Sequence, residues 1–429
     1  LSFLLIPFWI AFEFLHLDWD LTYPWLNLGN GFAEKYKWIQ WYEYTGAFGG
    51  CLWILTVNIL IFILFENRKA ERWGTKELSN KYFWLKITGV TGLIALPIIV
   101  SHIIYNNYEE KTAPTTIVAV QPNIDPYNEK FGGSFEEQLK KMFALATAKI
   151  DSSTDYLVFP ETSLTEDLWE NDIENTVSVA MIRDFLKKYP KLKIIAGAAT
   201  YKAFEPGDAI SETARKFKLE EGYYDAYNTA LQIDNDQKLQ IYHKSKLVPG
   251  VERMPFPALF KPIEKLAIDL GGTGGSLGTQ KERSVFTSPD RSLAIAPVIC
   301  YESIYGEYVG EYVNNGANFI FIITNDGWWG NTPGYKQHLA YGRLRAIETR
   351  RSIARAANTG ISCFINQRGD ISQSTAWWEP AVIKNVLNAN TEKTFYTKHG
   401  DYIARTALYF SICILGFVLI KSFSNNRYS

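Results

Sequence analysis

The sequence has little cysteine, histidine and methionine, and it carries almost no net charge. Its 429 residues include four cysteines, five histidines and three methionines, with 44 basic residues against 45 acidic ones. Four scattered cysteines without a Cys-x-x-Cys pair exclude a disulfide scaffold and a cysteine-ligated zinc motif. A net charge of −1 excludes a generic nucleic-acid-binding protein, which would be basic. We therefore expect no metal, no cofactor and no nucleic-acid partner.

Long hydrophobic runs, in contrast, are plentiful near both ends of the chain. Segments 46–65 and 87–105 contain no charged side chain, and segment 402–420 contains only Arg405. A helix needs about 20 apolar residues to cross a hydrocarbon core of about 30 Å. We expect each run to form a transmembrane helix, although a buried helix of a soluble core is the alternative. Segment 1–17 is interpreted as the end of a further membrane helix.

The distribution of positive charge predicts how these helices are oriented. The short loop 66–86 holds six lysines and arginines, whereas loop 18–45 holds two. Short loops rich in Lys and Arg remain in the cytoplasm. We therefore expect loop 66–86 and the tail 421–429 to be cytoplasmic and the middle region 106–401 to lie outside the cytoplasm. The aromatic loop 18–45 belongs at the membrane interface, either as an aromatic belt or as a platform for lipid.

The middle region 106–401 alternates strand and helix patterns, which predicts an α/β domain. The whole chain is 21% charged and 15% aromatic, and this composition excludes a disordered protein. Expected strands are 116–120, 156–159, 193–197, 229–233, 239–243, 292–299, 319–324 and 362–365. Expected helices are 135–150, 177–188, 305–314 and 337–351.

Candidate catalytic residues follow three of these expected strands, and the carboxyl ends of strands are where functional groups gather in open α/β sheets. Glu161 follows a strand that Pro160 ends, although a surface or helix-capping glutamate would look the same. Lys244 and Lys246 follow a second strand, with Glu252 shortly after, and a surface ion pair is the alternative there.

The third position is Cys300, between an apolar strand and an expected helix. The positive end of that helix would favour the thiolate, although a buried inert cysteine is equally compatible with the pattern. A cysteine nucleophile needs a base and a group that stabilises negative charge. Glutamate can be the base and lysine the stabiliser.

Several motifs resemble the nitrilase, or carbon–nitrogen hydrolase, superfamily, whose hallmark is a Glu-Lys-Cys triad on an αββα sandwich. The membrane helices on both sides narrow the resemblance to the apolipoprotein N-acyltransferase family. The resemblance covers nearly the whole chain. The stretches that carry it are PWLNLGN (24–30), PET (160–162), HKSKLVP (243–249), CYES (300–303), TNDGWWG (324–330) and residues 334–371.

The resemblance implies a role for each matching residue. Glu161 would be the general base, Lys244 the oxyanion stabiliser and Cys300 the nucleophile. Lys244 is preferred over Lys246 because the family's lysine stands three residues before Leu-Val-Pro. Glu252 matches a second glutamate of the family, within a local sequence, PGVERMP, that departs from the usual one.

Further residues have expected supporting or substrate-binding roles. Tyr301 and Glu302 follow the nucleophile as they do in the family. Phe131 stands where the family's arm after the first strand often carries a tryptophan. We expect substrate contacts from Phe131, Trp328 and Trp329. The glycine-rich segment 271–278 is interpreted as a mobile loop over the site.

The family's activity, as the resemblance implies it, moves a fatty acyl chain from a membrane phospholipid to an apolipoprotein. The acceptor is the N-terminal α-amine of S-diacylglyceryl-cysteine, and the route is a ping-pong reaction through a Cys300 thioester. We expect a monomer in the bacterial inner membrane with its catalytic domain on the periplasmic face. The alternatives are a membrane-tethered amidase that hydrolyses a small amide and a non-enzymatic binding relative. The chain has no initial methionine. The resemblance implies eight membrane helices in a complete member, of which this chain supplies about four, so we expect a truncated chain that lacks roughly the first three helices and part of the next.

Overall fold

The computed structural model describes residues 2–72, 80–130, 132–219, 221–236, 238–256 and 276–425. The chain divides into two compact units. The first comprises Leu1–Glu109 and Thr394–Ser429, and the second comprises Glu110–Lys393.

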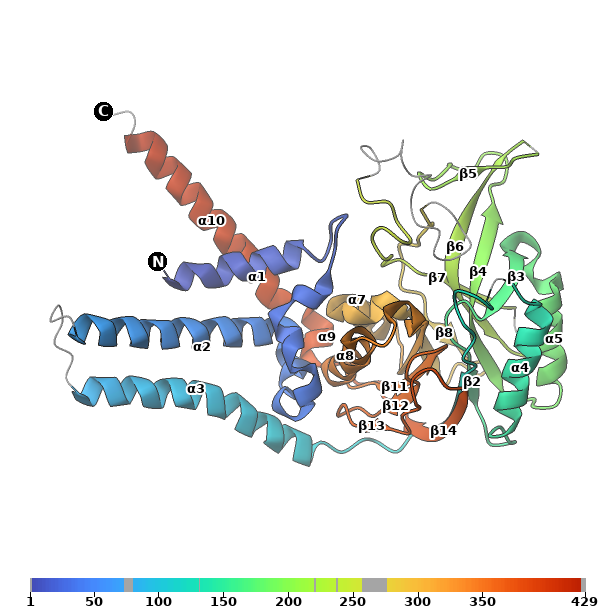
Figure 1. The fold of residues 1–429 in the computed structure, drawn as a ribbon, viewed down its shortest axis with the longest axis horizontal. Helices are drawn as coiled ribbons and strands as arrows, with labels where there is room; N and C mark the ends of the chain where they lie inside the picture. Colours follow the sequence, from blue (N-terminus) through green and yellow to red (C-terminus); the bar gives the residue numbers. More distant parts are fainter. Residues whose placement is uncertain are drawn as a thin grey trace. The chain divides into compact units, whose positions relative to one another are not determined.

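The first unit is helical, and three of its helices are long and apolar enough to cross a membrane. These stretches are Tyr42–Asn67, Phe83–Asn107 and Tyr402–Ser424, and each contains one of the three expected runs. Its helices are α1 (Leu5–Leu15), α2 (Tyr42–Arg72), α3 (Asn80–Asn107), α9 (Phe395–His399) and α10 (Tyr402–Asn425), with short 3-10 helices η1 (Ser2–Leu4), η2 (Pro24–Leu26) and η3 (Leu28–Trp38). Helices α2 and α3 pack against each other (Figure 1).

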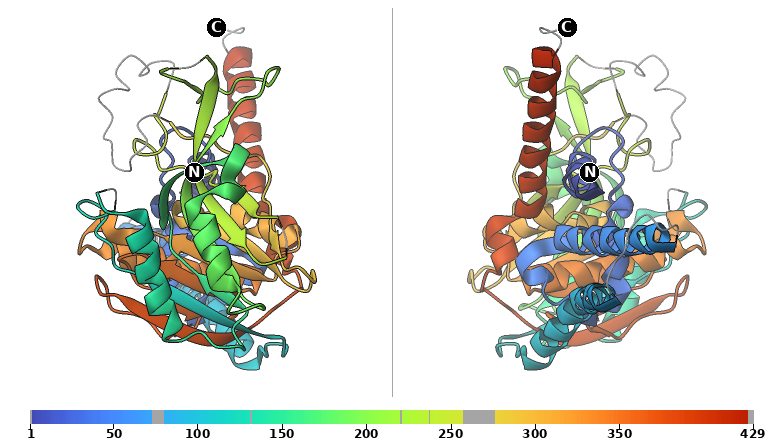
Figure 2. Two further views of the ribbon diagram at one scale, coloured as in Figure 1. Left: turned by 90° about the vertical axis from the view of Figure 1, so that its right-hand side faces the viewer. Right: turned by 90° about the vertical axis from the view of Figure 1, so that its left-hand side faces the viewer.

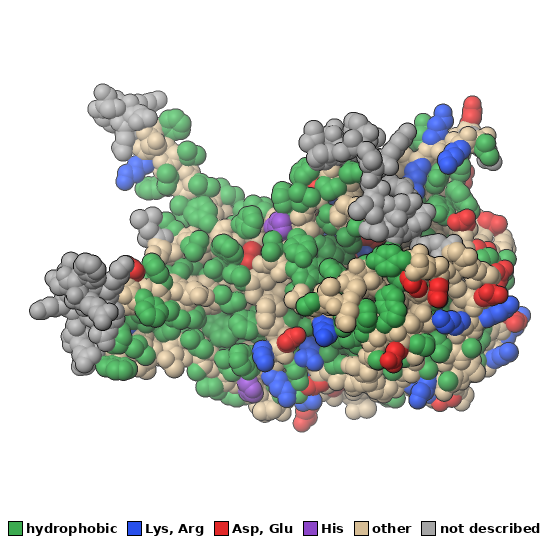
Figure 3. Space-filling model, viewed as in Figure 1, with side chains coloured by type: hydrophobic (Ala, Val, Ile, Leu, Met, Phe, Trp, Pro, Cys, Tyr) green, Lys and Arg blue, Asp and Glu red, His purple; other side chains and the backbone are tan. Residues whose placement is uncertain are grey.

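Large apolar side chains cover the outer surfaces of the three long helices. Phe65, Leu96 and Phe417 are 72%, 62% and 68% exposed, and hydrophobic side chains dominate this surface in Figure 3. A soluble monomer rarely exposes a continuous apolar surface of this kind, because contact with water is unfavourable. The surface of the first unit is therefore typical of a membrane protein.

The aromatic loop between α1 and α2 is folded onto these helices around a buried carboxylate. Glu13 of α1 accepts hydrogen bonds from Leu28 N at 3.0 Å and from Cys51 Sγ of α2 at 3.0 Å. A Cβ atom on Gly29 would lie 1.8 Å from Ala47 O, so only glycine permits this approach of loop to helix. The PWLNLGN motif thus provides a tight packing contact in the first unit.

The second unit is a sandwich of two sheets with helices on both outer faces. One sheet has the order β14-β1-β2-β4-β6-β5, with β3 beside β4 and β7 beside β6, and the other has the order β13-β12-β11-β10-β9-β8. The strands of the first are β1 (Pro114–Gln121), β2 (Tyr156–Val158), β3 (Leu164–Trp169), β4 (Lys193–Ala203), β5 (Arg215–Lys216), β6 (Tyr223–Ile233), β7 (Gln240–His243) and β14 (Ala381–Asn388). Those of the second are β8 (Phe286–Thr287), β9 (Ala294–Ile299), β10 (Phe319–Thr324), β11 (Ser352–Ala357), β12 (Cys363–Ile365) and β13 (Ile371–Ser372).

Each sheet is covered by two helices, which confirms the expected αββα architecture (Figures 1 and 2). Helices α4 (Phe135–Thr147) and α5 (Val177–Leu186) pack their apolar faces on the first sheet around a core of Leu, Ile and Val side chains. Helices α7 (Gly306–Asn314) and α8 (Pro333–Thr349) cover the second. Between the sheets, the ring of Tyr156 meets the ring of Phe321 edge to face at 5.3 Å.

Every expected strand and helix is present, but the ends of the fourth expected helix, 337–351, are wrong. That helix begins at Pro333 and ends at Thr349, because Arg350 adopts a left-handed conformation with φ of 50° and ends it. The next residues, Ser352–Ala357, form the buried strand β11, which the sequence analysis did not include. The charged Arg355 interrupts a run of otherwise small or apolar residues, so the sequence pattern does not indicate a strand there.

Candidate active site

A tight turn after β2 places Glu161 at the carboxyl end of this strand of the first sheet. Pro160 ends the strand, and Thr162 has a left-handed φ of 45°. The turn lies directly on β4, where Gly197 N donates to Pro160 O at 3.1 Å. A Cβ atom on Gly197 would lie 2.6 Å from the Cα atom of Glu161. The position of this carboxylate therefore depends on a glycine in the neighbouring strand.

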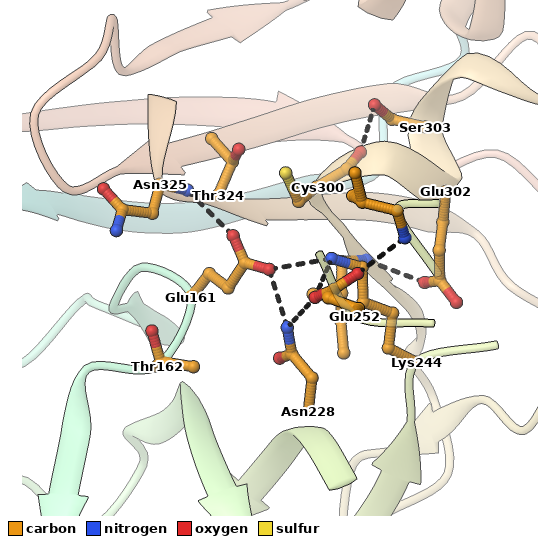
Figure 4. A network of polar contacts seen from close by, with 12 residues as sticks. Glu161, Thr162, Asn228, Lys244, Glu252, Cys300, Glu302, Ser303, Thr324 and Asn325 are labelled. Atoms are coloured by element: carbon orange, nitrogen blue, oxygen red, sulfur yellow. Dashed lines mark hydrogen bonds and ion pairs between the residues drawn. The ribbon is translucent and has the colours of Figure 1, made fainter. Parts of the chain in front are cut away.

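The Glu161 carboxylate is buried and has polar partners on both oxygens (Figure 4). Oε1 lies 3.0 Å from Lys244 Nζ and accepts from Asn228 Nδ2 at 2.8 Å. Oε2 accepts from the backbone N–H of Asn325 at 3.0 Å. Burial raises the pKa of Glu161, but the Lys244 charge and the Asn228 hydrogen bond outweigh it, so the net pKa is lowered. Glu161 is therefore ionised at neutral pH and able to accept a proton.

Lys244 lies between two carboxylates at the end of β7. Its ammonium is 2.8 Å from Glu252 Oε1 in addition to its contact with Glu161. Asn228 Nδ2 also donates to Glu252 at 2.9 Å, so one amide bridges both acids. Burial lowers the pKa of Lys244, but the two carboxylates outweigh it and raise the pKa well above its usual range. Lys244 is thus positively charged at neutral pH. Lys246, the other candidate lysine, has its Nζ over the ring of Tyr305, 5.0 Å from the ring centroid.

Cys300 occupies the bend between β9 and the 3-10 helix η6 (Cys300–Ile304). Its φ of 48° is left-handed, and its side chain is half-buried beside Thr324 (Figure 4). Burial and the negative charge of Glu161 raise the pKa of the thiol, and the opposing effect of Lys244 is smaller. Burial and the charge of Glu161 therefore outweigh the stabilisation of the thiolate that was expected from a helix terminus. Cys300 is therefore a thiol that needs a base.

Glu302 connects the Cys300 bend to the strand that carries Lys244. Its Oε2 accepts from Ile299 N at 2.9 Å, which caps η6, and its Oε1 accepts from Ser245 N at 2.7 Å. The Tyr242 hydroxyl also donates to Oε1 at 2.7 Å. Glu302 thus supports the position of the lysine and the cysteine without facing the reacting groups.

Two of the three expected substrate-binding residues, Trp328 and Trp329, follow strand β10 and have identifiable packing neighbours. Trp328, on the 3-10 helix η7 (Asp326–Trp329), meets the ring of Tyr127 edge to face at 5.1 Å. Trp329 packs over Gly334, where a Cβ atom would lie 2.6 Å from the indole ring. Tyr301 is buried, with its ring edge to face with Tyr305 at 5.6 Å. Phe131 and residues 271–275 of the glycine-rich loop lie outside the described residues.

Two residues that the sequence analysis missed belong to this site. Asn228 comes from the middle of β6, where nothing in the local sequence distinguishes it. Lys130 is only 4% exposed, and its Nζ contacts the Thr162 hydroxyl and lies 3.5 Å from Glu161 O. Burial lowers the pKa of Lys130 to about 8, although the negative charge of Glu161 partly opposes this. In the described ranges, no three His, Cys, Asp or Glu side chains are grouped as metal ligands would be.

Comparison with known proteins identifies the family. A model of the carbon-nitrogen hydrolase family matches residues 116–394, and a model of the apolipoprotein N-acyltransferase N-terminal domain matches residues 1–60. The apolipoprotein N-acyltransferase of Chlorobaculum tepidum is 31% identical over 416 residues, covering 94% of this chain and 74% of that protein. The chain belongs to the apolipoprotein N-acyltransferase family.

Other members of the apolipoprotein N-acyltransferase family match over similar lengths. Those of Geobacter metallireducens and Rickettsia prowazekii are 24% and 27% identical, covering 99% and 95% of this chain and 75% and 74% of those proteins. Nit3 of Saccharomyces cerevisiae, a member of branch 10 of the nitrilase superfamily, superposes with a TM-score of 0.46 at 15% identity. That alignment covers 66% of this chain and 92% of Nit3.

Replacing Gly197 by alanine should displace the Glu161 turn. The new Cβ atom would overlap backbone atoms of that turn, and overpacking of this kind costs about 1–3 kcal/mol. We expect a lower melting temperature and an acyl-transfer rate reduced by at least about 10-fold, since a small misplacement of a catalytic group is costly. The control is Gly310→Ala in α7, where a Cβ atom meets nothing within 4 Å and should stabilise the helix. Equal activity of the two variants would contradict the prediction.

The buried charge of Lys130 predicts a pH-dependent stability. Its pKa of about 8 in the folded protein is below the unfolded value of 10.5, so the unfolded state binds more protons between those pH values. Relative to Lys130→Met, the wild type should gain stability as pH rises from 8 to 10, by at most about 1.4 kcal/mol per pH unit. The measurement is the difference between the two melting temperatures at each pH. A difference that does not change with pH would disprove this assignment.

Proposed function

We propose that this acyltransferase moves a fatty acyl chain from a membrane phospholipid to the N-terminal α-amine of S-diacylglyceryl-cysteine of apolipoproteins. The observation that carries the proposal is the cluster around Cys300, in which a thiol, an ionised Glu161 and a permanently charged Lys244 come together. These are the three functions that acyl transfer through a thioester requires: a nucleophile, a base and a fixed positive charge.

In the first half-reaction, the Cys300 thiol attacks the ester carbonyl carbon of the phospholipid. Glu161 accepts the thiol proton as the carbon–sulfur bond forms, because the raised pKa of Cys300 disfavours a free thiolate. The negative charge that develops on the carbonyl oxygen is stabilised by Lys244 Nζ and by the backbone N–H of Tyr301. The carbon–oxygen bond then breaks, and the lysophospholipid oxygen takes the proton back from Glu161. An acyl thioester remains on Cys300.

In the second half-reaction, the α-amine of the apolipoprotein attacks the thioester carbonyl. Such an amine has a pKa of about 7.7–8.0, so most of it is protonated near pH 7 and must lose a proton to react. Glu161 accepts the proton that the attacking nitrogen loses. The carbon–sulfur bond breaks, the Cys300 sulfur is reprotonated by Glu161, and an amide-linked third acyl chain is the product.

The membrane helices suit substrates that carry acyl chains. Each CH₂ group kept in an apolar environment contributes about 0.8 kcal/mol, so extracting a long chain into water would be prohibitive. Anchoring the enzyme in the bilayer brings it to substrates that remain there. From the excess of lysine and arginine in loop 66–86, we propose that the enzyme domain lies on the periplasmic face of the bacterial inner membrane. We propose a monomer, because the flanking membrane helices would obstruct association of the sandwich domains.

The test is intact-protein mass spectrometry after incubation with phospholipid. The wild type and the control Cys413→Ala, whose cysteine is exposed on α10, should each gain one acyl group that hydroxylamine removes. Cys300→Ala should gain none. Addition of a diacylated lipopeptide should discharge the adduct and give a triacylated product. Turnover of a small amide without any acyl adduct would instead support a membrane-tethered amidase.

Two further variants test the roles of the charged residues. Glu161→Gln removes the base and should slow adduct formation by about 10²–10⁴-fold. Lys244→Met removes the charge that faces the oxyanion and should slow it by about 10²–10³-fold. Single-turnover rates of adduct formation provide the measurement. A wild-type rate in either variant would exclude the role given to that residue.

A further inference from the structure

A buried histidine lies behind the nucleophile, on the helix that covers the second sheet. His338 of α8 is 1% exposed, and its Nε2 lies 3.0 Å from the carbonyl oxygen of Cys300. The same nitrogen lies 2.9 Å from Ser303 Oγ. The sequence analysis assigned no function to this residue, and the proposed mechanism does not use it.

The other side of the imidazole ring is held by a carboxylate. His338 Nδ1 lies 2.9 Å from Asp326 Oδ1, and Arg355 Nη2 donates to Asp326 Oδ2 at 2.5 Å. The Thr324 hydroxyl also donates to Asp326 at 3.0 Å. Burial raises the pKa of Asp326, but the charge of Arg355 and the hydrogen bonds of His338 and Thr324 outweigh it and hold the pKa below its usual range. Asp326 is therefore an ionised, immobile acceptor that orients the ring.

The direction of the hydrogen bond to Cys300 follows from its chemistry. A backbone carbonyl oxygen can only accept, so we take the tautomer of His338 in which Nε2 carries a proton and donates it to this oxygen. The Ser303 hydroxyl donates to the same carbonyl at 2.7 Å, so this oxygen has two donors. Two donors on one carbonyl constrain the orientation of the Cys300–Tyr301 peptide.

That peptide is the one whose N–H faces the developing oxyanion in the proposed mechanism. A trans peptide is planar, and its C=O and N–H point in opposite directions, so holding the Cys300 oxygen also aims the Tyr301 N–H. Hydrogen bonds to the oxygen also polarise the amide and strengthen its N–H as a donor. The bend needs such support, because a non-glycine residue with positive φ, like Cys300, is strained by about 1–3 kcal/mol.

We propose that His338 is a positioning residue for acyl transfer, which orients and polarises the Cys300–Tyr301 peptide so that the Tyr301 N–H can bind the oxyanion. Asp326 acts one step further back by fixing the imidazole ring. This inference rests on the proposed function, since it requires Cys300 to be the acylated nucleophile.

A pair of substitutions separates the two hydrogen bonds of the ring. In His338→Gln, the side-chain amide nitrogen reaches the place of Nε2 and can still donate to the Cys300 carbonyl. In His338→Asn, the shorter amide reaches only the place of Nδ1, beside Asp326. We expect acylation by phospholipid to fall by about 10- to 100-fold in His338→Asn with little change in KM. His338→Gln should retain most of the rate.

A second reaction of the same thiol distinguishes an oxyanion effect from a structural defect. Alkylation of Cys300 by iodoacetamide forms no tetrahedral oxyanion, so it should proceed at the wild-type rate in His338→Asn. Ser303→Ala removes the other donor with little change in packing and should lower acylation about 3- to 10-fold without affecting alkylation. This variant and His338→Gln provide the test if His338→Asn does not fold.

The outcomes separate this inference from the proposed function. If the wild type forms no acyl adduct on Cys300, the proposed function fails and this inference fails with it. If the wild type is acylated but His338→Asn and Ser303→Ala are acylated at the same rate, only the role of His338 is wrong. Parallel losses of acylation and alkylation would also overturn it, because they would show that the two residues simply maintain the fold around the thiol.

Discussion

The contact of the Lys244 ammonium with the buried Glu161 carboxylate and the half-buried Glu252 carboxylate is the interaction on which the site depends. Three charged groups are removed from water here, and isolated burial of any one would be strongly unfavourable. The 3.0 and 2.8 Å ion pairs offset that penalty only because Asn228 and the Asn325 backbone satisfy further carboxylate lone pairs. Buried ion pairs contribute little net stability. The arrangement is best explained by its chemistry, since it keeps Glu161 ionised and Lys244 charged beside a neutral thiol.

The remainder of the enzyme domain holds these groups at the ends of strands from two different sheets. Glu161 and Lys244 come from the first sheet and Cys300 from the second, so the active site requires the sheets to face each other. Backbone strain at Thr162 and Cys300 is tolerated because both bends are supported by hydrogen bonds from neighbouring elements. Glu302, in particular, binds backbone N–H groups on both sides of the junction between the two sheets.

The first unit shows the same combination of an apolar framework and one buried polar cluster. Its three long helices present hydrophobic side chains outward, whereas Glu13 is enclosed and accepts from Leu28 and Cys51. A buried carboxylate is costly unless it is hydrogen-bonded. Here the carboxylate fixes the PWLNLGN loop against α2. The aromatic loop is thus a packed part of the first unit.

The sequence by itself determined the features that are local in the chain. An apolar strand followed by a bend marked Glu161, Lys244 and Cys300 as strand-end residues. Apolar runs of about 20 residues marked the long hydrophobic helices, and the motifs indicated the family. Only the tertiary structure decided which distant residues join the site. Lys130, Asn228 and His338 come from a loop, the middle of a strand and the interior of a helix, and their partners lie far away in the sequence. A pattern of hydrophobicity cannot identify such residues, because a buried polar side chain is accounted for only by the partner that folding brings to it.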